Sequence, residues 1–327
     1  MRVLPWVVLL MGVLWGGYWF VGSRALNHGA EAWFAGQAKA GLIAEHDSLS
    51  VQGFPNRFDL TVNGLHLADP ATGYGWTAPF VQLLSLSYTP WHWIAALPPQ
   101  QTFQTPFEDL TLASTKLQGS IIVVPGPDLA LDRITVVGDA LSLGSSNGWT
   151  ASAQTLRFAT RQTGSDGLVQ EVGLEVLGIT PDQTVLAALP GLAAMLDRVH
   201  LDANVTLTAP LDRHAEQTRP EVAGIEVKDL SVTWGDLGLS GKGTVTADAE
   251  GRAAGKIDLH LMNWRKLIPV AIKAGLVTPE VAPTWEKMLA LFAQQSGDPN
   301  DLALPLGFKN GRMSLGPLPL GPAPRMN

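Results

Sequence analysis

The stretch RFDLTVNGLHL, residues 57–67, shows the pattern that sets the fold of this chain. Every second residue is apolar, with the alternation resuming after a glycine, and these residues are Phe58, Leu60, Val62, Leu65 and Leu67. Alternation with a period of two is typical of a β-strand with one buried face, whereas apolar residues of a helix recur every three or four positions. The stretch therefore predicts a long amphipathic strand.

Similar runs recur along the chain, at 116–124, 133–137, 151–161, 168–177, 200–208, 225–234, 243–247 and 256–261. Near the C-terminal end, alternation over 302–308 is followed by Asn310-Gly311 and a further run over 312–315. Asn-Gly between two alternating runs is the strongest short-range signal for a hairpin. So many amphipathic strands predict a mainly β (α+β) fold, an elongated, curved antiparallel sheet whose apolar face is enclosed.

Helices are predicted at a few places between the strands. A helical extension of the N-terminal segment covers 25–45, a short helix covers 192–197, and a third covers 264–274 behind Asn263 as a plausible N-cap. In 283–295 the apolar residues lie three and four positions apart, which predicts an amphipathic helix. The segment from Gly316 holds four prolines, so we expect it to be extended.

The N-terminal segment predicts a membrane anchor. Residues 3–21 contain no charged side chain and lie between Arg2 and Arg24, and a bilayer core needs about 20 apolar residues in a helix. A secretory signal peptide is the alternative, but its apolar core has only about 7–15 residues and ends in small residues. Here aromatic residues crowd the far end, as is typical of a membrane interface. We therefore favour an uncleaved anchor, and its candidate residues are Trp6, Gly12, Trp15, Gly16 and Trp19.

Gly12 and Gly16 have the GxxxG spacing that lets two membrane helices approach closely, and a lipid-facing patch is the equally acceptable interpretation. The positive N-terminus with Arg2 favours a cytoplasmic N-terminus and a periplasmic body on a bacterial inner membrane. The expected organisation is an anchor over 1–24, the helical extension over 25–45, a β-rich body over 46–315 and a proline-rich tail over 316–327. The body is expected to consist of two sub-halves meeting near 180–220.

The composition excludes several classes of function. The chain has no cysteine, so it has no disulfide, no thiolate nucleophile and no zinc-thiolate site. A formal net charge of −7 argues against nucleic acid as a partner and against a basic patch that docks on anionic lipid. Hydrophobic residues make up 46% of the chain, which is enough for a sizeable core.

One catalytic motif is matched by residue type alone. Residues 144–148 match G-x-S-x-G with Ser146 in the nucleophile position, but that chemistry requires a strand, a sharp turn and then a helix. The residues that follow form a strand-like run, so a plain turn is favoured. The seven histidines show no i, i+4 pair. We therefore predict no catalytic residue, no cofactor and no metal site. Glu171 and Glu175 share one face of a predicted strand, which we expect to be solvated.

Four large aromatic residues are candidates for the lining of an apolar ligand groove, and these are Phe58, Trp76, Trp91 and Trp93. Large aromatic side chains are mostly buried, so a structural role in the core is the stronger interpretation for the tryptophans.

Two blocks of sequence carry a family resemblance. The first begins with GFPNRFD at 53–59 and continues through ADPATG at 68–73 to LSYTPWH at 86–92, and the second runs over 304–321 with KNGR at 309–312. Together they resemble DUF2125, a bacterial membrane-anchored family of unknown function. The layout matches over nearly the whole chain, although 100–220 carries no matching motif. The resemblance supplies no catalytic or binding residues.

The arrangement of a strand-rich body behind one N-terminal helix, with GKGTV at 241–245 and GKI at 255–257, also looks like the AsmA-like envelope proteins. That likeness implies a role in envelope maintenance or lipid traffic, with lipid held in a groove of a curved sheet. It is an architectural analogy, and a fold does not determine a function.

Three hypotheses follow. The first is a non-enzymatic periplasmic module, tethered to the inner membrane, that binds lipid or another apolar ligand along a groove. The second is a scaffold or assembly factor that binds only envelope proteins, through a sheet edge or an exposed apolar patch. The third is a hydrolase using Ser146 or dispersed carboxylates, which would require a deep cleft with Ser146 beside a histidine and an aspartate.

Overall fold

The computed structural model describes residues 3–164, 166–188, 191–273, 275, 277–296 and 298–326. Over these residues the chain is mainly β, with 52% in strands and one antiparallel sheet of 18 strands. One long N-terminal helix, Leu4–Lys39, precedes them. The predicted fold class is therefore confirmed. The predicted helical extension over 25–45 ends too late, because residues 43–45 form a strand that pairs with residues 66–68. The chain forms two compact units: unit 1 comprises 1–124 and 136–149, and unit 2 comprises 125–135 and 150–327.

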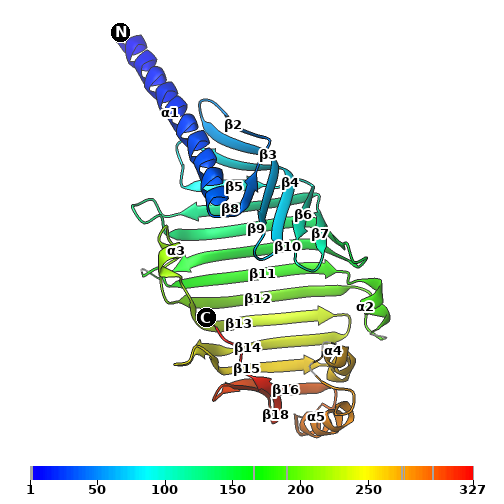
Figure 1. Cartoon of the computed structure of the whole chain (residues 1–327). Helices are drawn as coiled ribbons and strands as arrows, with labels where there is room; N and C mark the ends of the chain where they lie inside the picture. Colours follow the sequence, from blue (N-terminus) through cyan, green and yellow to red (C-terminus); the bar gives the residue numbers. More distant parts are fainter. Residues whose placement is uncertain are drawn as a thin grey trace. The chain divides into compact units, whose positions relative to one another are not determined.

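The first elements of the chain form unit 1 (Figure 1). They are α1 (Leu4–Lys39), β1 (Ile43–Glu45), β2 (Ser48–Gln52), β3 (Arg57–Asp69), β4 (Tyr74–Leu86), β5 (His92–Ala96), β6 (Gln100–Gln104), β7 (Asp109–Ala113) and β8 (Lys116–Val123). Strand β9 (Leu131–Ser145) begins in unit 2 and ends in unit 1.

Strand β3 is the centre of unit 1, and the alternation over 57–67 explains why. One side of β3 pairs with β4, and the other side pairs with β1 and β2. The alternating residues form one buried face, on which the second half of α1 packs through Phe34. The buried members of this cluster are Phe34, Leu60, Val62, Leu65, Ala78 and Val81. The predicted amphipathic strand is confirmed.

The remaining elements belong to unit 2. They are β10 (Thr150–Thr163), β11 (Val169–Ile179), α2 (Gln183–Ala187), β12 (Leu196–Leu207), α3 (Ala215–Thr218), β13 (Val222–Trp234), β14 (Leu237–Ala247), β15 (Ala253–Met262), the 3-10 turn η1 (Trp264–Lys266), α4 (Leu267–Lys273), α5 (Ala282–Ser296), β16 (Asp301–Lys309), β17 (Arg312–Leu315) and β18 (Leu318–Pro322). Each strand from β10 to β18 pairs with the next one along the chain (Figure 1).

The helix over 192–197 was predicted wrongly. Pairing of Leu196 with Ile179 extends β12 back to this point, so sheet formation prevails over local helix propensity. The short helix lies earlier, at α2, where the Asp182 carboxylate caps it by accepting a hydrogen bond from the Thr184 N–H at 2.8 Å.

The helices predicted over 264–274 and 283–295 are present as η1 with α4 and as α5, while Ala274 lies outside the described residues. Asn263 does not cap by its side chain. Its φ is 54°, and its side-chain amide donates instead to the Asp236 carbonyl at 2.6 Å.

The hairpin predicted at Asn310-Gly311 is present between β16 and β17. Both residues have positive φ, 53° and 69°, as a two-residue type I′ turn requires. The proline-rich tail is extended and contributes β18, which pairs with β17.

Candidate functional site

Helix α1 is joined to β3 by its aromatic residues. The Trp19 side chain is only 7% exposed, stacks on Phe58 with ring centroids 6.2 Å apart, and donates from Nε1 to the Arg57 carbonyl at 2.6 Å. The Tyr18 hydroxyl donates to the Ser87 carbonyl at 2.7 Å. A Cβ atom at Gly22 would lie 2.7 Å from Phe58 Cζ, so the helix approaches the ring this closely only because residue 22 is glycine.

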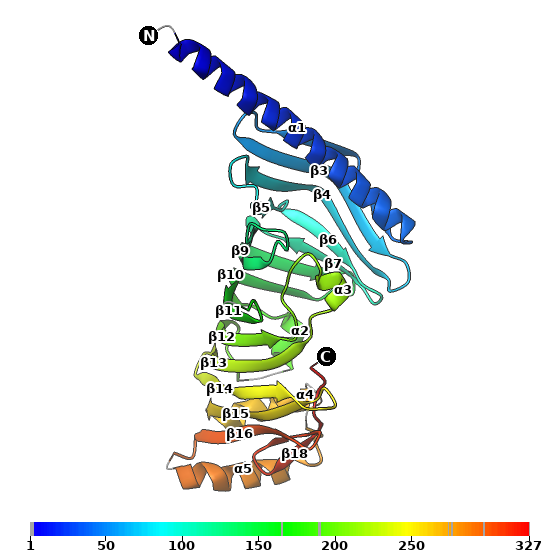
Figure 2. The ribbon, with the colours of Figure 1, turned by 90° about the vertical axis from the view of Figure 1, so that its left-hand side faces the viewer.

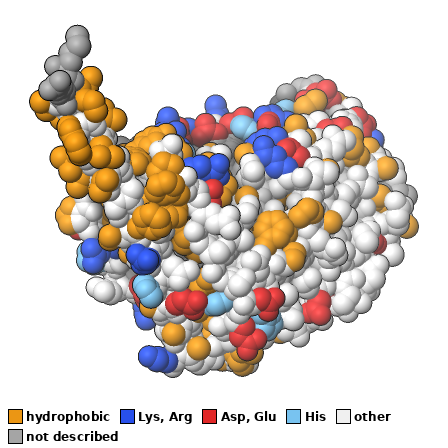
Figure 3. All heavy atoms as spheres, turned by 90° about the horizontal axis from the view of Figure 1, so that it is seen from above, with side chains coloured by type: hydrophobic (Ala, Val, Ile, Leu, Met, Phe, Trp, Pro, Cys, Tyr) orange, Lys and Arg blue, Asp and Glu red, His pale blue; other side chains and the backbone are white. Residues whose placement is uncertain are grey.

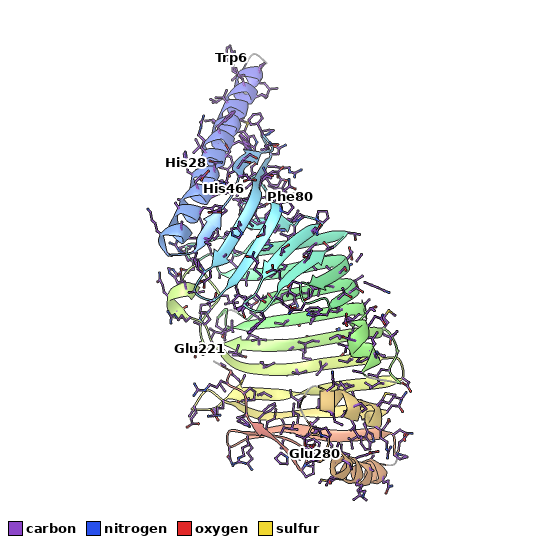
Figure 4. The ribbon with its side chains drawn as sticks, turned by 45° about the vertical axis from the view of Figure 1, so that its right-hand side comes forward. Trp6, His28, His46, Phe80, Glu221 and Glu280 are labelled. Carbon is purple, nitrogen blue, oxygen red and sulfur yellow. The ribbon has the colours of Figure 1, made fainter. Side chains whose placement is uncertain are left out.

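The candidate anchor residues divide between exposed positions and positions that face the body. Trp6 is 70% exposed near the projecting end of α1 (Figure 4), and Gly12 has no atom within 4 Å of a Cβ position. Trp15 is also exposed. Gly16 faces the Phe54 ring, at 3.7 Å from the Cβ position, and Trp19 is buried. One half of the GxxxG motif therefore contacts the protein's own body.

An apolar cavity lies where the second half of α1 meets the end of the unit 1 sheet. Its volume is about 440 Å³, within the range typical of small-molecule sites. Trp33 of α1, Trp76 of β4 and Phe103 of β6 line it, and the last two rings stack with centroids 6.2 Å apart. Trp76 Nε1 donates to Gln101 Oε1 at 2.8 Å, which holds the indole in place.

The four predicted groove residues do not form one site. Trp76 lines the cavity, whereas Phe58 belongs to the junction with α1. Trp91 lies in the loop between β4 and β5, and Trp93 lies on β5 with its indole donating to the Pro90 carbonyl at 2.9 Å. These four residues lie apart because a surface of a sheet is formed by residues on paired strands, and closeness in the sequence does not place residues on the same surface.

Unit 2 carries an apolar face that is wider than any single predicted run. Because paired strands align their alternating residues, two rows of aliphatic side chains cross β11 to β16. One row consists of Val176, Val199, Val232, Leu239, Leu261 and Leu302. The other consists of Leu174, Leu201, Leu230, Gly241, Leu259 and Leu304. These two rows are called the apolar face below.

The apolar face is covered unequally. At β16 its members Leu302 and Leu304 are buried in a cluster with Trp264 and Leu289 of the adjoining helical segments. In β11 to β13 its aliphatic residues are only half-buried. The strands of unit 2 bend (Figure 2), and the aliphatic side chains on β11 to β13 keep part of their surface accessible to solvent.

The opposite face of the same strands is charged. Lys228 donates to the Glu171 carboxylate at 2.9 Å and lies 3.7 Å from Asp202, while Arg161 also pairs with Glu171. The pKa of Glu171 is held below its ordinary value of 4.5, chiefly by the hydrogen bond from Lys228 and then by that from Arg161. This face is solvated, as the spacing of the two predicted glutamates indicates.

Ser146 has a structural environment. It is exposed in the turn between β9 and β10, so a strand and not a helix follows it. Its Oγ accepts the Asp109 N–H at 3.0 Å. The adjoining Ser145 and Trp149 side chains both donate to the Glu108 carboxylate, the latter at 2.8 Å. These bonds hold a turn together and provide no activated nucleophile.

The residues that the structure describes contain no group of three or more His, Asp or Glu side chains placed to hold a metal ion. The sequence interpretation missed the apolar face as a unit. Its signal was present in the period-two runs, but the alignment of one run against the next depends on strand register.

The fold and these surfaces define a mainly β protein with one apolar helix, long enough to cross a membrane by length and composition, joined to its sheet. The family model described as an uncharacterized protein conserved in bacteria (DUF2125) matches residues 19–324, and the chain belongs to this family. The resemblance seen in the sequence is confirmed. Comparisons with curated proteins and with solved structures gave no match.

Replacing Gly22 by leucine tests the junction between α1 and β3. The new side chain would displace the Phe58 ring, so we expect a lower melting temperature for the full chain in detergent, measured by circular dichroism. The control is Gly17→Leu, because Gly17 is exposed and has no atom within 4 Å of its Cβ position. Equal melting temperatures for the two variants would contradict this packing.

The charged face predicts a pH dependence. Because the folded-state pKa of Glu171 is lowered, its stabilising effect is present above the unfolded pKa and is lost as pH falls through the folded value. We expect the melting temperature to fall with acidification below about pH 4.5. Glu171→Gln is expected to weaken this fall, whereas Glu216→Gln on exposed α3 is expected to leave it unchanged. Identical pH profiles for the two variants would contradict the assignment.

Proposed function

We propose that this chain is a non-enzymatic, membrane-anchored protein whose body lies in the bacterial periplasm and binds lipid, or another apolar ligand, on the apolar face of unit 2. One observation carries the proposal. Strand register gathers aliphatic side chains from β11 to β16 into two adjoining rows, and those on β11 to β13 are incompletely covered.

The chemistry of the apolar face favours a hydrocarbon ligand. The rows contain aliphatic residues and one glycine, with no hydrogen-bonding side chain to recognise a polar group. Removal of apolar surface from water stabilises a complex by about 0.8 kcal/mol per buried methylene. An acyl chain lying across several strands would therefore gain affinity in proportion to its buried length, with little selectivity for its end group.

A protein that binds lipid and is tethered to the membrane is suited to envelope maintenance or lipid traffic, and we propose this role. The likeness of the layout to AsmA-like envelope proteins agrees with this role. The cavity at Trp33, Trp76 and Phe103 in unit 1 is a further apolar surface suited to the same class of ligand. Arg2, which lies outside the described residues, supports a cytoplasmic N-terminus through its charge.

The contacts of α1 support an anchor that is retained. Cleavage before Arg24 would remove Tyr18, Trp19 and Gly22, and would leave the Phe58 ring and the Arg57 carbonyl without the groups that cover them. A signal peptide has no reason to form buried contacts with the folded body that it leaves.

Site-specific photocrosslinking tests the ligand. The photoreactive amino acid p-benzoylphenylalanine is introduced into the full chain at Ile225 or Leu239, whose side chains share the apolar side of the sheet. The controls are Glu226 and Ser240, the next residues on the same strands, which are exposed on the opposite side. In bacteria grown with radioactive phosphate, we expect irradiation to attach labelled phospholipid at the first two positions and not at the controls.

Mass spectrometry of the crosslinked chains detects lipids without phosphate. Lipid adducts at equal levels on all four positions, or no adduct on any, would contradict lipid binding on this face. A protein adduct at Ile225 and Leu239 would overturn the lipid proposal in favour of the protein-binding scaffold.

The intact mass of the chain purified from bacterial membranes tests the anchor. We expect a mass that includes residues 1–24, because Trp19 and its neighbours are part of the folded body. A mature form that begins near Arg24 would show instead that the segment is a signal peptide.

A further inference from the structure

Two loops of unit 1 lie beside the exit of α1 from its apolar run. The first is the β2–β3 turn over 53–56, and the second is the β4–β5 loop over 87–91. The Ser87 N–H donates to the Asn56 carbonyl at 2.8 Å, and its hydroxyl donates to the Pro55 carbonyl at 3.2 Å. The two loops therefore form one surface.

This surface is held against a defined level of the helix. The Phe54 ring packs on Trp19 and on Phe20, with centroids 5.3 and 5.5 Å away, and lies near Gly16. Tyr18 donates to Ser87 of the second loop. The loops thus meet α1 at the level of residues 16–20.

The surface is aromatic and uncharged. Phe54 is 57% exposed, Tyr88 is 56% exposed, and Trp91 and Phe20 are exposed as well. Neither loop contains an acidic or basic residue, whereas Arg57 follows the turn directly and Arg24 lies three residues after the end of the apolar run 3–21. Hydrophobic side chains cover the projecting helix, and more of them lie beside it (Figure 3).

The length of α1 places this surface relative to a bilayer. A hydrocarbon core of about 30 Å requires about 20 helical residues at about 1.5 Å each. Counted from Val3, such a span ends near Gly22, which is beyond the level where Phe54 meets the helix. The residues before Gly16 alone would span only about 20 Å.

We propose that Phe54, Tyr88 and Trp91 form an aromatic collar that inserts into the outer leaflet around α1 and seats unit 1 on the lipid surface. The occupant of this exposed patch is the bilayer, because the patch continues the apolar surface of the membrane helix. Aromatic side chains are favoured at this depth, and the two arginines can extend toward the head groups. The collar requires the anchor and is independent of lipid binding on unit 2.

Depth-dependent fluorescence quenching tests the collar. The chain has no cysteine, so single cysteines can be introduced into the full chain and labelled with the polarity-sensitive dye NBD. The variants are Phe54→Cys, Tyr88→Cys, the control Phe107→Cys, and Val7→Cys in the helix. Phe107 is the matched control, because it is 85% exposed in another loop of unit 1, between β6 and β7.

The labelled chains are reconstituted in vesicles of phosphatidylethanolamine and phosphatidylglycerol that contain spin-labelled lipid. We expect quenching and a blue-shifted emission at positions 54 and 88, and neither at 107. Tyr88→Cys keeps the inference testable if loss of Phe54 disturbs the packing on Trp19. If the label at position 7 is quenched while the labels at positions 54 and 88 stay unquenched, as at position 107, the collar is overturned and the anchor remains intact. An unquenched label at position 7 would overturn the membrane span and the collar with it.

Discussion

The packing of α1 on β3 is the interaction on which the rest of unit 1 depends. One helix supplies an apolar segment suited to a bilayer and, on the same continuous rod, side chains that complete a protein core. Trp19 belongs to both, since it lies inside the apolar run and is buried against Phe58. Helix α1 is continuous over 36 residues, so no loop separates its apolar run from the part that packs on unit 1, and insertion of that run in a bilayer would bring unit 1 close to the lipid.

Unit 2 depends on a different constraint, which is that the two faces of its sheet differ in polarity. Alternating residues of each strand place charged side chains on one face of the sheet and aliphatic side chains on the other. The antiparallel register keeps each kind on the same face from one strand to the next. The charged side chains are stabilised by solvation and by ion pairs such as that of Lys228 with Glu171. The aliphatic side needs a cover, and Leu302 and Leu304 have one from the helical segments at the C-terminal end. On β11 to β13 the aliphatic side chains are only half-buried, and this part of the apolar face is where the proposed ligand would bind.

Much of the fold could be predicted because its signals are local. The period-two alternation from Phe58 onward identified β3, and Asn310-Gly311 identified a hairpin because few residues adopt two positive φ values in succession. The helix predicted over 192–197 was wrong because the signal that decides this segment is not local. Its neighbours in sequence favour a helix at Leu196, but Leu196 pairs with Ile179 on another strand.

The sequence by itself determined the apolar helix, the strand-rich body and the absence of cysteine chemistry, because composition and periodicity carry these properties within a few residues. Only the tertiary structure decided that Trp19 faces inward, that Trp76 lines a cavity while Trp91 and Trp93 lie elsewhere, and that residues as distant as Leu174 and Leu259 share one surface. The physical reason is that pairing register and helix docking are set by contacts between distant segments, which no local pattern encodes.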